Sequence, residues 1–232
     1  DISLAIGPTV TIATVLLAVQ ISTKLTKAAI PNSAPILLLN PLNPLFIINT
    51  VGVMFFNNKV FGFYILISHI IGNILTGLLF RNIYITNNNT LTSSLKTSIK
   101  NFYYDINNTK IFKELLNGIK KSLNILINIF GIMTCFLIIT KIITLKLNLS
   151  PFPSSILSGL LEMTTGLKSI TSLNITEKTK LLLSTFFISF GGLSVHAQIF
   201  SMLNNYKINY YIFLISRLIH ASLSVFICLF LY

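Results

Sequence analysis

Residues 181–203 read LLLSTFFISFGGLSVHAQIFSML, and this stretch decides the class of fold. It contains no Asp, Glu, Lys or Arg and has the length and polarity of a helix that crosses the hydrocarbon core of a membrane. Gly191 and Gly192 interrupt the run at its middle, and His196 and Gln198 follow within two turns. We therefore expect a broken transmembrane helix with polar side chains just beyond the break.

The composition of the whole chain points to the same class of fold. Of 232 residues, 53% are hydrophobic and 9% are charged, whereas soluble domains average about 25% charged residues. Mean hydropathy is +0.80. These values exclude a disordered chain and an ordinary soluble domain. They predict an all-α, polytopic membrane protein with about five spans and with two or three broken or re-entrant segments.

The chain is strongly basic, with 17 Lys and Arg against 5 Asp and Glu and a formal net charge of +12. Most basic residues lie in polar loops between apolar runs, so the expected partner is the lipid bilayer with its anionic headgroups, and not nucleic acid. In the simplest threading, one side of the membrane carries Lys24, Lys27, Lys59, Lys141, Lys146, Lys168, Lys178 and Lys180. The other side carries a nearly equal number, so the charges do not orient the chain.

Four segments follow one another along the sequence. Residues 1–34 read as an N-terminal transmembrane span, and residues 35–81 as a broken apolar segment followed by a full span, with unwound backbone at Asn40–Pro44. Residues 82–121 form a polar, basic loop that ends in an interfacial helix starting near Thr109. Residues 122–232 contain a span, a re-entrant segment, a broken helix and a final span.

The re-entrant segment begins where Pro151-Phe152-Pro153 breaks the chain. Ser154 and Ser155 can cap a short helix that carries Glu162 and stops near Gly166. A helix of roughly a dozen residues is too short to cross a membrane, so this segment is expected to enter and leave on one side.

Two parts of the sequence resemble one another. Asn57-Asn58-Lys59 precedes a span that contains Leu66-Ile67-Ser68-His69, and Asn204-Asn205-Tyr206-Lys207 precedes a span that contains Leu214-Ile215-Ser216-Arg217, with registers that differ by one residue. A helix breaker lies thirteen residues before each Asn pair. Interrupted segments at corresponding places in two halves indicate a transporter binding site. If the broken segment of the second copy crosses fully, the two copies run in opposite directions, as in an inverted repeat.

Polar residues at the breaks are the candidates for solute binding. A carboxylate on a short apolar helix is expensive, so Glu162 is interpreted either as a solute, proton or sodium site or as a structural tie to a lysine or to backbone amides. Ser194, His196 and Gln198 fit contacts with a polar solute or contacts between helices. The candidate site residues are Asn40, Asn43, Glu162, Gly191, Gly192, Ser194, His196 and Gln198.

Other polar residues have simpler interpretations. His69 and His220 are expected to tie helices together, and Arg217 to extend its side chain along the helix to the membrane surface. Ser194 with His196 or His220 offers a nucleophile and a base, but G-x-S is a common tripeptide, and we expect no enzymatic activity. Because H-E-x-x-H, C-x-x-C and glycine-rich phosphate loops are missing from the sequence, no metal and no cofactor are expected.

Several of these motifs resemble one protein family. Residues 39–53, LNPLNPLFIINTVGV, resemble the N-x-x-x-PLFIIG-x-VG stretch of the YlbJ-type sporulation integral membrane proteins, which carry a nucleoside-recognition or Gate domain. Ser68-His69, LLEMTTG at 160–166 and ISFGGLSVHAQ at 188–198 resemble the same family. The resemblance covers about residues 35–82 and 120–232, which would form two Gate-like halves, and leaves 1–34 unmatched.

The resemblance implies a multi-pass protein of the cytoplasmic membrane that is needed for endospore formation. Gate domains also occur in nucleoside transporters and ferrous-iron transporters, which suggests movement of a solute. We therefore expect a Gate-type transporter or permeation component for a small polar solute. The alternative is a non-transporting scaffold whose basic 82–121 segment docks other sporulation membrane proteins.

Overall fold

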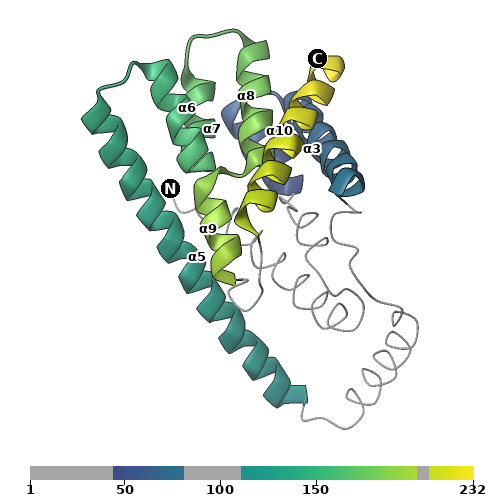
Figure 1. Cartoon of the computed structure of the whole chain (residues 1–232), viewed down its shortest axis with the longest axis vertical. Helices are drawn as coiled ribbons and strands as arrows, with labels where there is room; N and C mark the ends of the chain where they lie inside the picture. Colours follow the sequence, from purple (N-terminus) through teal and green to yellow (C-terminus); the bar gives the residue numbers. More distant parts are fainter. Residues whose placement is uncertain (1–43, 81–110, 203–208) are drawn as a thin grey trace.

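The computed structural model describes residues 44–80, 111–202 and 209–232, and every regular element in these ranges is a helix (Figure 1). Within them, four segments are long and apolar enough to cross a membrane. They are α3 (Lys59–Phe80), the Leu123–Leu147 part of α5 (Ile111–Leu147), the segment Glu177–Ser201, and α10 (Tyr210–Leu231). The expected all-α polytopic fold is confirmed. The predicted span in 1–34 and most of the Asn40–Pro44 break lie outside the described residues.

The segment Glu177–Ser201 consists of two helices, α8 (Glu177–Phe190) and α9 (Gly192–Met202), which follow one another in nearly the same direction (Figure 1). The predicted break at Gly191 and Gly192 is therefore present. Gly191 adopts φ 90° and Gly192 φ 68°, a left-handed conformation that residues with a side chain rarely adopt. The Gly191 amide donates to the Phe187 carbonyl over 2.8 Å and so closes the end of α8.

Helix α10 lies between α3 and α8 and runs antiparallel to α3. Phe61, near the start of α3, contacts Tyr232 just beyond the end of α10, with ring centroids 6.1 Å apart. His69 and His220 meet midway along the two helices, with ring centroids 4.8 Å apart. The two spans of the predicted repeat therefore run in opposite directions, as an inverted repeat requires.

The α3 and α10 spans also bury corresponding residues. Residues 63–70 of α3 and 211–218 of α10 show an identical succession of exposed, half-buried and buried positions. Ile67 and Ile215 face outward, whereas Ser68-His69 and Ser216-Arg217 are buried. The weak sequence match thus corresponds to two helices that bury equivalent faces.

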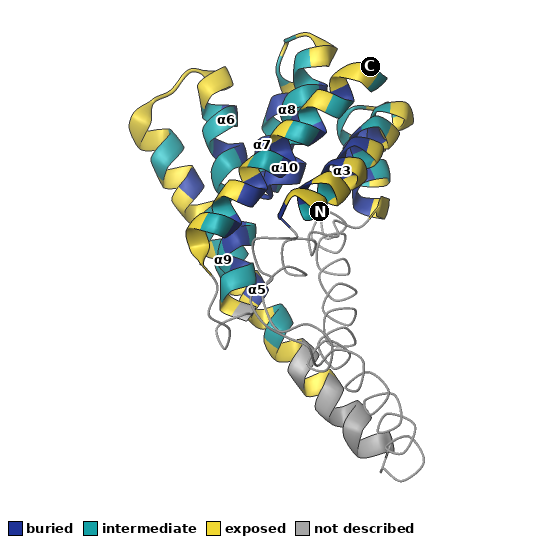
Figure 2. Cartoon of the chain, turned by 45° about the vertical axis from the view of Figure 1, so that its right-hand side comes forward, coloured by how far each residue is buried: buried dark blue, intermediate teal, exposed yellow. Residues whose placement is uncertain are grey.

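Large apolar side chains cover the outside of the bundle, while its buried positions hold polar as well as apolar residues. Figure 2 shows which residues are buried and which are exposed. On α10, the outward-facing Phe226 and Phe230 are 59% and 76% exposed, while Arg217 and His220 are 2% and 1% exposed. Such an apolar surface is suited to hydrocarbon and not to water, and it places the chain in the lipid bilayer as a multi-pass membrane protein.

The segment predicted to be re-entrant is a hairpin of two short helices, α6 (Pro151–Leu161) and α7 (Met163–Ser172). Short loops join its outer ends to the end of α5 and the start of α8, so both ends lie at the same end of the molecule (Figure 1). The helices pack closely because Gly166 lies against Gly159, where a Cβ atom on Gly166 would overlap the Gly159 backbone. The expectation of one helix that carries Glu162 and stops near Gly166 is wrong: Glu162 separates the two helices and Gly166 lies inside α7.

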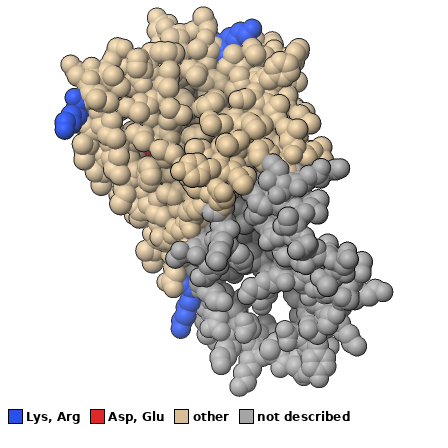
Figure 3. All heavy atoms as spheres, in the orientation of Figure 1, with Lys and Arg blue, Asp and Glu red and all other residues tan. Residues whose placement is uncertain are grey.

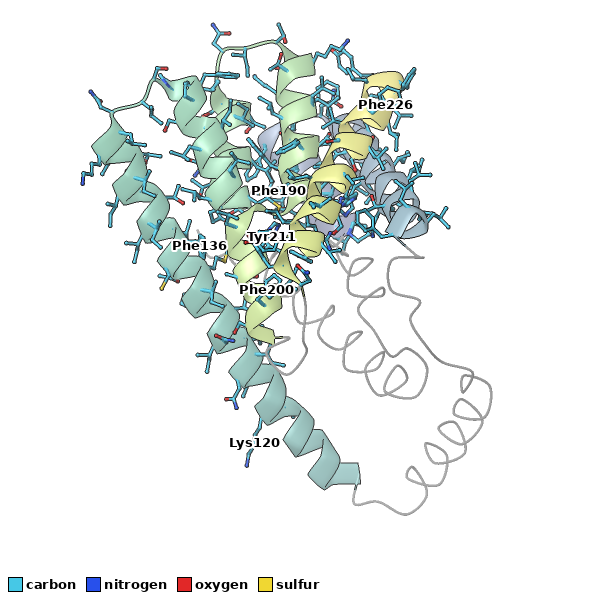
Figure 4. The ribbon with its side chains drawn as sticks, viewed as in Figure 1. Lys120, Phe136, Phe190, Phe200, Tyr211 and Phe226 are labelled. Atoms are coloured by element: carbon cyan, nitrogen blue, oxygen red, sulfur yellow. The ribbon has the colours of Figure 1, made fainter. Side chains whose placement is uncertain are left out.

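Helix α5 is one continuous helix of 37 residues, about 55 Å long. The predicted boundary between an interfacial helix ending at residue 121 and a span starting at 122 therefore falls inside a helix. No proline interrupts the sequence from Ile111 to Leu147, so nothing in it ends the helix at that boundary. Its first part, which includes Lys120, extends beyond the other helices (Figure 4).

Ahead of α3, the segment η1 (Phe46–Phe55) is wound as a π-helix and turns back onto α3. Gly52 and Gly62 approach so closely that a Cβ atom on Gly52 would lie 2.9 Å from the Gly62 Cα. Ile47 and Val51 are fully buried, so η1 belongs to the packed interior.

Four of the described lysines lie at one end of the bundle, which we call the lysine end. Lys59 begins α3, Lys146 lies at the end of α5, and Lys178 and Lys180 lie in the first turn of α8. The Lys178 ammonium lies 5.9 Å from the ring centroid of Tyr232, which places the start of α8 beside the end of α10. Figure 3 shows Lys and Arg side chains at the edges of the described part of the molecule and few charged atoms over the rest of this face. This arrangement agrees with the threading that assigned these lysines to one side.

Candidate functional site

Two helix interruptions meet inside the bundle. A Cβ atom built on Gly192 would lie 3.1 Å from the Met163 amide nitrogen and 3.3 Å from the Gly159 carbonyl oxygen. The tip of the α6–α7 hairpin therefore packs against the α8–α9 break. The contact is this close because Gly192 has no side chain. Gly192 therefore lies beside the residues that flank Glu162 on both sides, so two of the predicted site residues belong to neighbouring parts of the structure.

Glu162 occupies the hairpin tip and is 2% exposed. Its carboxylate accepts hydrogen bonds from the amides of Thr164 (3.1 Å) and Thr165 (2.7 Å) and from the hydroxyls of the same two residues (2.6 and 2.8 Å). The side chain thus caps the first turn of α7, where unpaired amides and the helix dipole favour a negative charge. Of the two interpretations of Glu162, the tie to backbone amides is the contact that the structure shows.

His196 bridges the α8–α9 break. Its Nε2 donates to the Phe190 carbonyl over 2.9 Å, and its ring packs against Phe190 and Phe213 with centroid distances of 4.8 and 5.1 Å. Because a carbonyl only accepts, the neutral ring carries its proton on Nε2, and Nδ1 is a bare acceptor. That Nδ1 atom has no hydrogen-bond partner among the described residues, nor has the buried Ser194 hydroxyl.

The structure shows less about the remaining predicted site residues. Gln198 lies on α9 and is 7% exposed. Asn40 and Asn43 lie outside the described residues. Ser194 forms no hydrogen bond with His196 or His220, so the described contacts do not assemble the nucleophile and base considered for these three residues.

A second polar group, which the sequence analysis did not include in the site, lies between α3, α8 and α10. His69 Nδ1 and Ser189 Oγ share a hydrogen bond of 3.1 Å, and His220 Nε2 donates to the His69 carbonyl over 3.1 Å. The second bond ties α3 to α10, as expected of these histidines. Opposite them, Gly72 leaves room for Ser224, whose hydroxyl would collide with a Cβ atom at position 72.

Arg217 joins the two groups. It does not extend to the membrane surface as expected, because its guanidinium lies over the Phe213 ring, 5.1 Å from the centroid, and the residue is 2% exposed. His196 packs edge-on against the same Phe213 ring, and His220 lies one turn further along α10, so Arg217 is placed between the two groups. The signal in the sequence was the spacing of Ser216, His220 and Ser224, which places three polar residues on one face of α10.

We call this set of buried polar residues the polar compartment, and it comprises His69, Ser189, His196, Arg217, His220 and Ser224. It combines a fixed positive charge with hydroxyl groups and bare imidazole nitrogens, which can bind a polar solute or water. Over the ranges that the structure describes, no group of three or more His, Cys, Asp or Glu side chains is placed to hold a metal ion.

Comparisons with known proteins agree with part of the resemblance. The chain is similar to the sporulation integral membrane protein YlbJ of Bacillus subtilis (strain 168), with 25% identity over 209 residues that cover 78% of this chain and 51% of YlbJ. The chain therefore spans about half the length of this relative. No protein-family model matches the chain, so the Gate domain has no support from that comparison. No solved structure matches it either.

Proposed function

We propose that the chain is part of a Gate-type transporter or permeation component that moves a small polar solute across the cytoplasmic membrane during endospore formation. The observation that carries this proposal is the meeting of two helix interruptions, at Glu162 and at Gly191–Gly192, beside a buried polar compartment. Irregular backbone at membrane depth is tolerated where protein or a water-filled cavity surrounds it, and transporters use it to bind solutes.

The similarity to YlbJ supports the sporulation part of the proposal. Because the match covers half of that protein, we propose that this chain supplies one portion of a translocation unit. The lipid bilayer is its environment, and other sporulation membrane proteins are its proposed partners.

The proposed roles follow from the contacts. Glu162 fixes the hairpin tip through its four hydrogen bonds, and Ser194 and His196 present unpaired polar atoms near the break. Arg217 gives the compartment a fixed positive charge, so small anions belong in any test of the solute together with nucleosides. None of these residues is assigned a catalytic step.

The proposal is tested by solute uptake into proteoliposomes with a panel of nucleosides and small anions. We expect saturable uptake of at least one solute, reduced about tenfold or more by His196→Ala or Arg217→Gln, since each removes a buried polar contact. Ser222→Ala is the matched control, because Ser222 lies on α10 but faces outward.

Two results would count against the proposal. If folded protein takes up nothing from the panel, the scaffold interpretation is favoured, and deleting residues 86–108 should then abolish partner binding. If uptake occurs but both interior variants transport as well as Ser222→Ala, the solute follows another route.

A further inference from the structure

Segment η1 keeps one unusual winding along its whole length. Its ten residues form a π-helix, in which each amide bonds to the carbonyl five residues earlier. At its end the Phe56 amide donates to the Val51 carbonyl over 3.0 Å, which continues the same pattern. π-Helices are rare and occur mostly as single turns inside α-helices, frequently at functional sites. Because η1 is longer than one such turn, contacts outside η1 must favour this winding over an α-helix.

The π winding decides which side chains of η1 face the interior. Ile47, Val51 and Gly52 are buried, and they lie four and five residues apart, as the wide turn requires. In an α-helix, residues three, four and seven apart share a face, so Ile47 and Val51 would share theirs with Met54. Met54 is instead 56% exposed. An α-wound η1 would therefore turn Met54 inward and carry Gly52 off the buried face.

Two glycines hold the π form against α3. A Cβ atom on Gly62 would lie 3.0 Å from the Ile48 Cα and 3.1 Å from the Ile47 carbonyl oxygen, so the two backbones meet directly. The Asn58 amide also donates to the Gly52 carbonyl over 2.8 Å. Because the burial of Ile47 does not distinguish the two windings, the glycine contact and this hydrogen bond select the π form.

We propose that η1 is a two-state element that rewinds between this π form and an α form and exchanges Gly52 for Met54 on its buried face. Each turn of a π-helix holds more residues than a turn of an α-helix, so rewinding lengthens η1 and moves its first residues along α3. Ile47 and Val51 share a face in both forms, so their burial favours neither. This inference rests on the proposed function in one respect, namely that the movement serves transport.

The movement would reach the candidate site through α7. Phe46 and Ile47 belong to the same buried cluster as Met163 and Leu167 of α7. Met163 directly follows Glu162 at the hairpin tip, and its amide nitrogen packs against the α8–α9 break. Rewinding of η1 therefore changes the packing behind the hairpin tip, where the two helix interruptions meet.

Distances between two spin labels test the rewinding. In a background with Cys135→Ser and Cys228→Ser, labels at Leu45→Cys and Val60→Cys occupy exposed positions near the starts of η1 and α3. Pulsed electron resonance measures their separation in lipid nanodiscs. Gly52→Ala favours the α form because alanine is the better helix former, and its Cβ atom would lie 2.9 Å from a backbone atom of α3 in the π form. We expect the population of a second, longer distance to rise about tenfold.

The matched control is Gly131→Ala, where no atom lies within 4 Å of the new Cβ atom, and it should leave the populations unchanged within about twofold. Thr50→Ala also favours the α form through helix propensity but leaves the glycine contact in place. It should raise the longer distance by a smaller factor, and it replaces Gly52→Ala if that variant loses helicity. Met54→Lys added to Thr50→Ala should reverse the change, because a lysine is tolerated at the exposed position of the π form and not at the buried position of the α form.

The distances decide the proposal without any solute. If Gly52→Ala and Thr50→Ala both keep the distance of the background, η1 has one form and the proposal fails. If the longer distance appears but Met54→Lys does not reverse it, η1 is displaced without rewinding, and the proposal fails as well. A protein that transports nothing can still show both forms, so failure of the proposed function leaves this test intact.

Discussion

Replacement of Glu162 by alanine is predicted to destabilise the protein by about 3 kcal/mol. The carboxylate accepts four hydrogen bonds at the hairpin tip, two from backbone amides and two from threonine hydroxyls. The hydroxyls can rotate toward carbonyls of their own helix, but the amides of Thr164 and Thr165 cannot find new partners. Two buried amides, at about 1.5 kcal/mol for each lost bond to a charged acceptor, give this magnitude.

Conservative replacements of Glu162 should lower the stability by smaller amounts. Glu162→Gln keeps one acceptor oxygen and should lose about half as much, about 1.5 kcal/mol. Glu162→Asp keeps the carboxylate on a side chain that is favoured at helix N-caps, so it should lose about 1 kcal/mol or less. Glu177→Ala is the matched control: Glu177 is half exposed, its ion pair with Lys180 spans 2.9 Å, and its loss should cost less than about 1 kcal/mol.

The assay is equilibrium unfolding by dodecyl sulfate in mixed micelles, followed by helicity, with the uptake assay run in parallel. If Glu162→Ala unfolds at the same detergent fraction as Glu177→Ala, the cap contributes nothing and the reasoning fails. If Glu162→Asp keeps its stability but loses uptake, the carboxylate also contacts the solute, which is the other interpretation of Glu162.

Two further predictions concern the glycine break and the histidines. Gly192→Ala should lower the free energy of unfolding by about 2 kcal/mol, because Gly192 has φ 68° and the new Cβ atom would lie 3.1 Å from the Met163 nitrogen. Gly131→Ala is the control: no atom lies within 4 Å of the new Cβ atom, so the same unfolding assay should show no change or a stabilisation of up to about 1 kcal/mol. The ¹⁵N spectra of histidine-labelled protein at neutral pH should show a proton on Nε2 of both His196 and His220, since both donate from that atom to a backbone carbonyl. A spectrum with the proton on Nδ1 of either ring would contradict the hydrogen bonds described above.

The class of fold and the α8–α9 break follow from the sequence because both depend on local properties. An uncharged apolar run of the length of a membrane specifies a span in any tertiary context. Two consecutive glycines interrupt a helix because their backbone prefers conformations that other residues avoid. The position of Gly191 and Gly192 within residues 181–203 was therefore sufficient to predict the break.

The sequence does not decide whether the turn of the α6–α7 hairpin lies at Glu162 or at Gly166. Neither glycine nor proline marks residue 162, and the expected helix end at Gly166 rested on the usual role of glycine at C-caps. In the structure Gly166 serves close packing against Gly159, and the turn is made where Glu162 can satisfy four donors. A sequence with a carboxylate two and three positions before threonines permits such a cap, but only the packing of α6 against α7 selects it.

Arg217 was misread for a related reason. An arginine within two turns of a helix start can reach the membrane surface, and that inference considered only position along α10. The face of α10 matters as much: Arg217 shares its face with Phe213 and His220, and that face packs against α3 and α8. The aromatic ring one turn earlier holds the guanidinium inside the bundle.

The weakness of the internal repeat has its own physical reason. The alignment that pairs Ser68 with Ser216 also pairs Gly72 with His220. Two antiparallel copies of one helix are related by a two-fold axis, and a residue on that axis meets its own counterpart. A Cβ atom on Gly72 would lie 3.3 Å from His220 Cδ2 and would collide with Ser224, so the two copies cannot both carry a large side chain there. If the two spans are copies of one repeat, a difference at this position is a packing requirement, and it leaves the larger residue, with its unpaired ring nitrogen, in the polar compartment.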